Sequence, residues 1–273
     1  FVSGPSLGVT GGHCDNNLLP YEFHSVSEGV ADGPWAVREI VRRNIKYGAT
    51  VIKFCGTGGV LSKGTKVGVQ QYTFEEMQAL VDEAHMRGLT VATHAHGTSG
   101  IKTAIKAGVD SVEHVSLLDE VGIELALEHG TYFSMDIYVT EYILSEGEKA
   151  GILEESLAKE RIVGKRQREN FQKAVKAGVK MVFGSDAGVY PHGDNGKQFA
   201  RMVRFGMTPM QAIQAATIHP ATLLKQQETL GSISAGKKAD IVGVKGNPLD
   251  DISLLENVGL VVKDGHVVKS VAM

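Results

Sequence analysis

The sequence predicts an α/β fold, namely a (β/α)₈ TIM barrel whose first two strands are absent from this chain, followed by a small C-terminal β-sandwich module. Three observations predict it. A unit of helix, glycine and β-rich run recurs along the chain, ionisable residues stand at the C-terminal ends of those runs, and the pattern becomes antiparallel after about Leu230.

The repeated unit is a segment with helical periodicity that ends in a basic residue near a glycine and is followed within about two residues by a β-rich run. Glycine after a helix supplies the left-handed residue that ends it, and a basic residue there suits the helix dipole. Connections this short predict parallel strands joined by crossover helices. The units place strands at 51–54, 90–94, 111–114, 132–135 and 180–183, and residues 1–4 add a sixth.

The sequence also predicts where one helix begins, because Thr73 and Glu76 have the spacing of a capping box. A doubly wound open sheet stays an alternative to the barrel. The first strand, however, lacks the G-x-G-x-x-G fingerprint of such folds, and no helix opens at Gly59 in the glycine-rich segment 55–59. A barrel needs eight strands and six are counted, so the first two are missing.

The C-terminal stretch predicts a second domain. Residues 239–244 predict a strand, and 259–263 and 266–269 predict a hairpin, because Asp264-Gly265 is typical of a type I′ turn. We therefore expect barrel strands three to eight in residues 1–229, and the C-terminal part of a composite β-sandwich in 230–273.

Composition excludes several classes of protein. With 42% hydrophobic residues in 273, the chain can bury a core, which excludes disorder. A net charge of −3 argues against partners that need a basic surface, namely nucleic acid and anionic membranes. Two cysteines cannot form a disulfide framework, so we expect a reducing, cytoplasmic location. The chain begins at Phe1 rather than Met, so an upstream segment is expected and secretion stays open.

Several strand ends carry residues that suit a divalent metal ion. His94 and His96 share one face of a strand, and His94 and His114 each stand six residues after the glycine of their unit. Asp186 follows the last strand between glycines. Imidazole and carboxylate ligands converging at a barrel mouth suit Zn²⁺ or a similar ion. The alternatives are a strand-end histidine that is only satisfied by polar neighbours, and an aspartate that caps a helix or loop.

Lys53 ends an apolar strand, where a bare ammonium would be costly to bury. It either pairs with a carboxylate at the barrel mouth or is converted to a carbamate that bridges two metal ions.

Four further residues are expected to contact substrate: His13, His96, Tyr138 and His192. His13 follows the first strand in a glycine-rich loop, although loop polarity explains it equally well. Tyr138, at the end of a strand over 132–138, could donate to an oxyanion or merely pack. His192 lies close enough to Asp186 to line the mouth. Cys14 and Cys55 have no partner arrangement for nucleophilic catalysis.

Lys53, His94, His114 and Asp186, in that order on successive strands, resemble the metal-dependent amidohydrolase superfamily. The segments 3–6, 10–13, 57–62, 94–97, 185–188, 191–195 and 236–242 resemble its prolidase and imidazolonepropionase-like branch. That branch includes Xaa-Pro dipeptidases, carboxypeptidases for basic amino acids and ochratoxin-type amidases.

The resemblance implies two zinc ions bridged by carboxylated Lys53. His94 and His114 would hold one ion, and Asp186 would bind the other and act as the base. The family also takes a His-x-His pair from its first strand, which this chain lacks. The resemblance further suggests a homo-oligomer.

The function expected is zinc-dependent hydrolysis of amide or peptide bonds in a small-molecule substrate. A metal-activated hydroxide would cleave Xaa-Pro dipeptides or N-acyl amino acids, with Asp186 as the general base. One alternative is a deaminase or imidazolone-type hydrolase of cyclic C–N bonds. Those relatives carry Glu three residues after the fifth-strand His, where this chain has Gly97. A second alternative is an inactive truncated scaffold.

Overall fold

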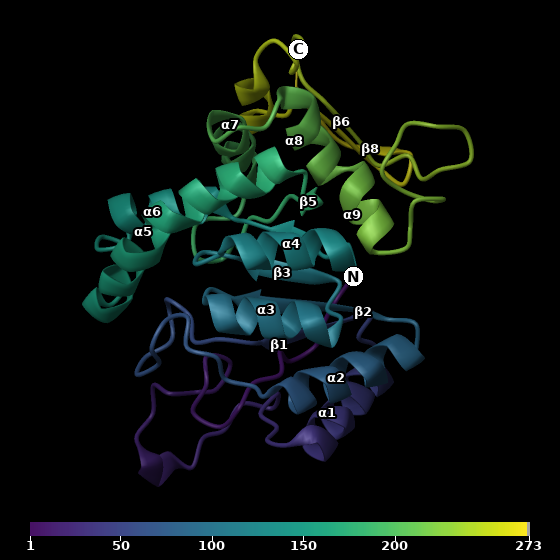
Figure 1. Ribbon diagram of the computed structural model, residues 1–273. Helices are drawn as coiled ribbons and strands as arrows, with labels where there is room; N and C mark the ends of the chain where they lie inside the picture. The colour runs from purple at the N-terminus through teal and green to yellow at the C-terminus, as the bar shows by residue number, and fades with distance from the viewer. Residues whose placement is uncertain (272–273) are drawn as a thin grey trace.

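A five-stranded parallel sheet forms the centre of the protein (Figure 1), as seen in a computed structural model that describes residues 1–271. Its strands are β1 (Val51–Cys55), β2 (Thr90–Ala95), β3 (Ser111–His114), β4 (Tyr132–Ser134) and β5 (Met181–Val182), and they lie side by side in chain order. A doubly wound sheet reverses its strand order at a switch point, and this sheet does not. The α/β fold is confirmed, with the sequential strand order of a β/α barrel.

Helices join the strands, and α2, α3 and α4 run side by side over one face of the sheet (Figure 1). In the part of the chain that the structure describes, no helix is long and apolar enough to cross a membrane. The helices are α1 (Pro34–Lys46), α2 (Phe74–Met86), α3 (Thr98–Ala107), α4 (Glu120–His129), α5 (Ile137–Glu146), α6 (Glu154–Ala177), α7 (Lys197–Arg204), α8 (Pro209–Ala216) and α9 (Ile218–Leu223), with short 3₁₀ turns η1 (Tyr21–Phe23), η2 (Asp194–Gly196) and η3 (Ile252–Glu256).

The helix ends follow the sequence signals. Gly108, Gly130 and Gly178 adopt left-handed conformations directly after α3, α4 and α6. Thr73 and Glu76 form the predicted capping box at the start of α2. These stops fix how far each helix runs, and therefore where the next strand enters the sheet.

The sixth strand predicted at residues 1–4 is wrong. Val2 does run beside β1, since its carbonyl accepts the Thr50 N–H at 2.8 Å, but regular pairing stops there. It resumes only at Leu7, whose N–H donates to the Lys53 carbonyl at 2.9 Å. Gly4 and Pro5 separate the two contacts, because Gly4 takes a positive φ and proline has no N–H for a ladder.

The C-terminal residues form a single three-stranded antiparallel sheet of β6 (Ile241–Gly243), β7 (Leu260–Lys263) and β8 (His266–Ser270). Asp264 and Gly265 both have positive φ, as the predicted type I′ turn requires. The domain boundary between residues 229 and 230 stays a prediction.

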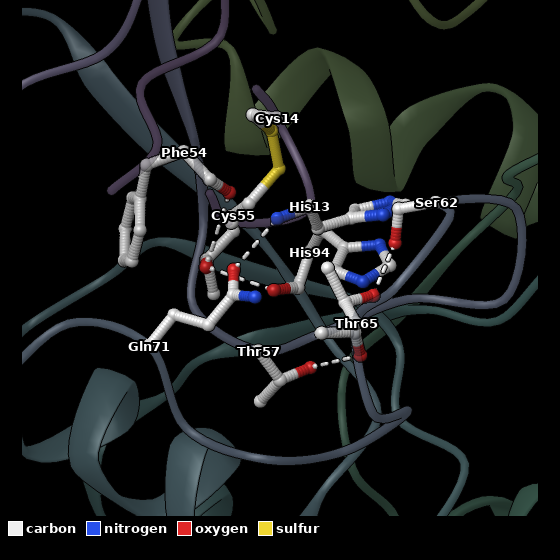
Figure 2. Close-up of a disulfide and its surroundings, with 12 residues drawn as sticks. His13, Cys14, Phe54, Cys55, Thr57, Ser62, Thr65, Gln71 and His94 are labelled. Atoms are coloured by element: carbon white, nitrogen blue, oxygen red, sulfur yellow. Dashed lines mark hydrogen bonds between the residues drawn. A yellow bond between two sulfur atoms is a disulfide. The ribbon is translucent and has the colours of Figure 1, made fainter. Parts of the chain in front are cut away.

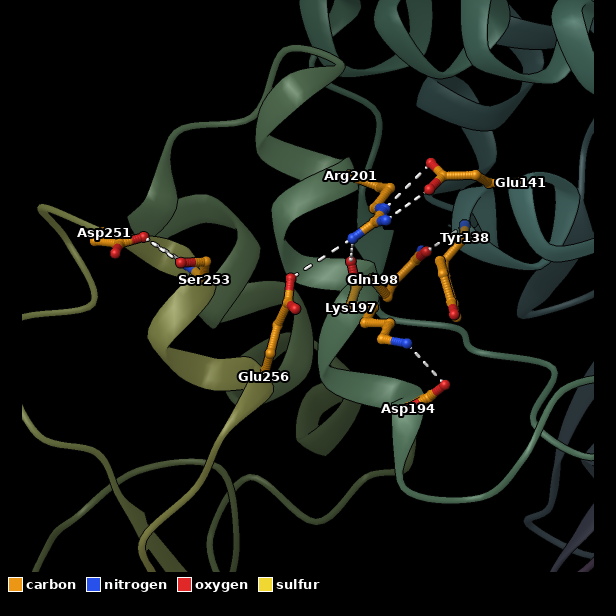
Figure 3. Close-up of polar contacts among 9 residues, drawn as sticks. All are labelled: Tyr138, Glu141, Asp194, Lys197, Gln198, Arg201, Asp251, Ser253 and Glu256. Atoms are coloured by element: carbon orange, nitrogen blue, oxygen red, sulfur yellow. Dashed lines mark hydrogen bonds and ion pairs between the residues drawn. The ribbon is translucent and has the colours of Figure 1, made fainter. Parts of the chain in front are cut away.

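An arginine on α7 ties this C-terminal region to the α/β body (Figure 3). Arg201 donates to Glu141 on α5 at 2.6 Å and lies 3.6 Å from Glu256 on η3. One guanidinium therefore links three elements that are far apart in the sequence.

Glu83 on α2 is the charged centre of the contact between α1 and α2. Its carboxylate, only 1% exposed, accepts hydrogen bonds from Arg42 at 2.8 and 2.9 Å and from Arg87 at 3.2 Å. The Arg42 hydrogen bonds in particular lower the pKa of Glu83 from 4.5 to about 2. Since the folded-state pKa is depressed, this stabilisation is present above pH 4.5 and is lost as the pH falls towards 2.

We expect Glu83→Gln to lower the free energy of unfolding at pH 7 by roughly 1–3 kcal/mol, because charge-assisted hydrogen bonds to a buried group are lost. The deficit should shrink as the pH falls below about 4.5, where the wild-type carboxylate also becomes protonated. Urea unfolding between pH 7 and pH 3 measures it, with Glu39→Gln on the exposed side of α1 as the control. An unchanged deficit at pH 3 would contradict this assignment.

Candidate metal centre

Three histidines meet at the C-terminal edge of the sheet. In the β2–β3 register Ala95 pairs with His114, so His94 and His96 flank the end of β3. The ring centroids are 4.6 Å apart for His94 and His114, 4.7 Å for His96 and His114, and 4.7 Å for His94 and His96. The strand-end pattern therefore brings together the histidines that the sequence singled out.

The backbone is strained where two of the candidate ligands sit. His114 and Val115 have φ values of 68° and 51°, and Asp186 has 51°, a region that side-chain-bearing residues rarely adopt. The Val115 N–H donates to the Ala95 carbonyl at 3.1 Å, which holds the turn in place. Strain of this kind clusters at functional sites, where a side chain must be aimed in one direction.

His114 is oriented by a buried carboxylate. Its Nδ1 lies 3.0 Å from both oxygens of Asp136, and the Gln167 amide donates to Asp136 at 3.0 Å. Burial alone would lower the pKa of His114, but attraction to Asp136 and the hydrogen bond outweigh it and raise this pKa to about 9. Because Nδ1 donates to Asp136, Nε2 is the nitrogen that would bind a metal ion, which would displace the Nε2 proton, as in carboxylate–histidine–metal arrangements.

The other imidazoles are kept neutral. Burial, together with the charge of neighbouring histidines, holds the pKa of His94 and of His96 well below the ordinary range. His94 Nε2 is buried and has no hydrogen-bond partner among residues 1–271. A neutral imidazole with an unused nitrogen is the form that binds metal ions, because a protonated ring has no lone pair to give.

Two sets of ligand atoms fit a metal ion. His94, His96 and His114 form one set and His114, Asp136 and Asp186 the other, and within each set the ligand atoms lie within 4.8 Å of one another. The unused His94 nitrogen and the neutral state of its neighbours fit a bound divalent cation such as zinc. The donor set is therefore suited to the metal that the sequence predicts.

Lys53 and Asp186 face the same cavity of about 290 Å³ as the histidines. Lys53 is half-buried on β1, and its positive charge contributes to the low pKa of His13 and His94. Asp186 stands at the open mouth, where partial desolvation, opposed by the charge of His114, raises its pKa. All four predicted metal ligands thus converge. Whether Lys53 carries a carbamate stays a prediction.

His13 also reaches this cavity, and its ring stacks on His94 with centroids 4.1 Å apart. A side chain at Gly59 would overlap the His13 ring, so this glycine makes room for it. Burial and nearby positive charge lower the pKa of His13 to about 4. The sequence analysis placed His13 and His96 in substrate contact, and both line the cavity.

The sequence has too few cysteines for a disulfide framework, but the two that it has are paired. Cys14 and Cys55 form a disulfide, with Cα atoms 6.1 Å apart, that ties the His13 loop to β1 (Figure 2). The loop is also held by the His13 N–H, which donates to Gln71 at 3.0 Å. A simple count of cysteines missed the pair, because 41 residues separate them and only the fold brings them together. The disulfide removes the reason for expecting a reducing compartment.

Two predicted substrate residues lie elsewhere. Tyr138 is not on a strand, because β4 ends at Ser134 and Tyr138 belongs to α5. Its backbone N–H donates to Gln198 at 2.8 Å, and its ring packs near Tyr190 and the Arg201 guanidinium (Figure 3). His192 is exposed. In the described chain neither lines the cavity, and contact of either residue with substrate stays a prediction.

Several polar residues of the cavity were not predicted from the sequence, among them Ser116, Asp136, Thr140, Glu160 and Gln167. Asp136 stands just after β4. The expectation that functional residues lie at the C-terminal ends of strands, which selected His94 and His114, would have selected it too. Ser116, which pairs with His96 Nδ1 at 2.8 Å, follows β3 in the same way. Glu160 and Gln167 lie inside the long helix α6, where periodicity gives no sign that they turn towards a site.

A family model described as the amidohydrolase family matches residues 2–268. Among curated proteins, the ochratoxinase of Aspergillus niger is 36% identical over 274 residues. That match covers 94% of this chain and 56% of the relative, so the chain spans about half the length of that protein.

Solved structures of hydrolases are also similar to this chain. A Xaa-Pro dipeptidase with bound methionine in the active site superposes with a TM-score of 0.94 at 42% identity, covering 99% of this chain and 68% of that one. A prolidase complexed with N-methylphosphonate-L-proline superposes with a TM-score of 0.90 at 33% identity, covering 98% of this chain and 69% of that one.

If the histidine cluster holds a metal ion, His94→Asn should weaken zinc binding by at least about tenfold, since a neutral buried nitrogen is lost. Competition with a chromophoric chelator measures the affinity. His266→Asn, on the exposed strand β8, is the matched control and should bind as the wild type does. Equal zinc affinity in all three proteins would place the metal elsewhere.

Proposed function

This chain belongs to the amidohydrolase family, and we propose that its histidine cluster serves a zinc-dependent hydrolase that cleaves the amide bond of Xaa-Pro dipeptides or N-acyl amino acids. The observation that carries the proposal is the convergence of neutral imidazoles, a lysine and a carboxylate on one cavity. The likeness to a Xaa-Pro dipeptidase and to a prolidase holding a phosphonate of proline supports the choice of substrate. A small-molecule substrate and a homo-oligomer are part of this proposal.

We assign the metal ligands as carboxylated Lys53, His94, His114 and Asp186. Bound zinc would lower the pKa of a water molecule and polarise the substrate carbonyl. Asp136 and Gln167 keep His114 in the tautomer that leaves Nε2 available, and the disulfide and Gly59 keep the His13 ring against His94.

Asp186 is the residue we assign to proton transfer. Its carboxylate would accept a proton during attack on the amide and return it to the nitrogen of the leaving amine. Asp186 faces the cavity beside the histidines, which places its carboxylate for both halves of that task. His13 and His96, which line the same cavity, are assigned to orienting the substrate.

The surroundings of Gly97 support an amidase over a deaminase. The relatives that deaminate carry Glu at this position. Here any side chain on Gly97 would overlap the carbonyl of Gly68, which packs directly against it. The loop around Gly68 would have to move before a glutamate could reach the cavity.

Asp186→Asn keeps the shape of the side chain but removes the proton acceptor. We expect kcat to fall by about two orders of magnitude or more, with some loss of metal because the residue is also a proposed ligand. Steady-state kinetics at saturating zinc, with zinc content measured on the same sample, separates the two effects. Activity within a few-fold of the wild type would show that another group moves the proton.

A substrate panel tests the reaction class. With zinc, we expect amino acid release from Xaa-Pro dipeptides first, and from Xaa-Arg, Xaa-Lys or N-acyl-Phe compounds as the next choices. Cytosine, adenosine and imidazolonepropionate complete the panel. Ammonia from the nucleobases without amino acid from the peptides would favour the deaminase, and a zinc-loaded protein inert towards every compound would favour the scaffold.

A further inference from the structure

A third acidic residue faces the cavity, on the wall that α6 provides. Glu160 is 3% exposed and lines the same cavity as the histidines. Its Oε1 has no hydrogen-bond partner within the described residues. A buried carboxyl without a donor costs stability, so its place in a cavity wall calls for a ligand.

The hydrogen bonds around Glu160 leave its Oε1 without a donor among the described residues. Gln167 donates its two amide protons to Asp136 at 3.0 Å and to the His114 carbonyl at 3.2 Å. The side-chain oxygen of Gln167 therefore points away from these two acceptors. That oxygen accepts the Thr140 hydroxyl at 2.8 Å. Thr140 neighbours Glu160, but its one proton is already given to Gln167. The network that orients His114 therefore uses the donor that Glu160 would otherwise receive.

Neighbouring cations do not pair with Glu160 either. Lys159, the adjacent residue, turns to the Ser62 carbonyl at 2.6 Å and to Glu155 at 2.8 Å. Burial is the main cause that raises the pKa of Glu160 to about 7. Contact with the Thr140 hydroxyl opposes this rise, the Asp136 charge adds to it, and the charges of His114 and Arg168 oppose it. A cation brought into the cavity would make the carboxylate the stable form.

A glycine and three apolar side chains surround Glu160 in the cavity wall. A side chain at Gly164, one helical turn further along α6, would overlap both Glu160 Oε1 and Thr140. Apolar Val139, Ile143 and Val189 line the cavity and reduce competition from water. In residues 1–271, no set of three close ligand atoms includes Glu160, so it stands apart from the candidate metal ligands.

We propose that Glu160 determines specificity by binding a positively charged nitrogen of the substrate while the amide lies at the histidine cluster. The inference rests on the proposed amidase function and narrows its substrates to cationic ones. Two sources provide such a nitrogen: the free α-ammonium group of a dipeptide, or the basic side chain of a lysine-like residue. An N-acyl amino acid with a neutral side chain has neither.

Two isosteric pairs test the proposal without any variant. Alanyl-phenylalanine and isobutyryl-phenylalanine differ in the α-ammonium group, and N-acetyl-lysine and N-acetyl-2-aminoheptanoic acid differ in the side-chain ammonium. We expect kcat/KM of the zinc-loaded wild type to favour the charged member of one pair by about tenfold or more. The pair that shows the preference identifies the source of the nitrogen. No preference in either pair would overturn the proposal.

Glu160→Gln keeps the size of the side chain and removes its charge. It should abolish the preference by slowing the charged compound about tenfold or more, while the neutral isostere changes little. Glu169→Gln, on the exposed side of the same helix, is the matched control and should behave as the wild type. A preference that survives Glu160→Gln would assign the cation to another residue.

Calorimetric binding of the same four compounds separates this proposal from the proposed function. If the zinc-loaded chain turns over none of them but still binds the charged member of one pair about tenfold more tightly, the amidase assignment fails and the Glu160 assignment stands. If it hydrolyses the neutral compounds as well as the charged ones, the amidase assignment stands and the Glu160 assignment fails. Equal binding within both pairs also contradicts the role of Glu160.

Discussion

Four imidazole rings packed at one sheet edge cannot all be protonated, and this electrostatic constraint shapes everything around them. Asp136 is the buried carboxylate in hydrogen-bond contact with the cluster, and it serves His114. His13, His94 and His96 must therefore be neutral, as the lowered pKa of each indicates. Such a cluster is costly for a folded chain unless a cation binds the unused nitrogens, which gives the arrangement a physical reason to exist.

The rest of the fold holds these rings in place. The sequential parallel sheet brings the ends of β2 and β3 together, and left-handed backbone at His114 turns its side chain to Asp136. The loop of His13 is joined to β1 by the disulfide. Helix α6 supplies Gln167, which donates to Asp136 and accepts the Thr140 proton, and Glu160, whose Oε1 has no donor in the described residues. The hydrogen-bond network that holds His114 thus also involves the neighbours of the residue that we propose selects the substrate.

Local patterns in the sequence predicted the parts of this arrangement that depend on neighbouring residues. Helix stops at Gly108 and Gly130, the capping box at Thr73 and the Asp264-Gly265 turn are set by local backbone preferences, so they could be foreseen. The convergence of His94, His114 and Asp186 could be foreseen because parallel strands end at a common edge. Contacts between distant segments could not. The Cys14–Cys55 bond, the position of Tyr138 inside α5 and the inward turn of Glu160 depend on packing that leaves no local signature.

The proposed function depends most directly on a metal ion bound within the histidine cluster. Crystals of the zinc-loaded protein, measured on both sides of the zinc absorption edge, locate the ion by its anomalous difference density. We expect a peak at a coordination distance of about 2.0–2.1 Å from nitrogens of His94 and His114. A cluster without anomalous density at saturating zinc, its imidazoles contacting water alone, would contradict it.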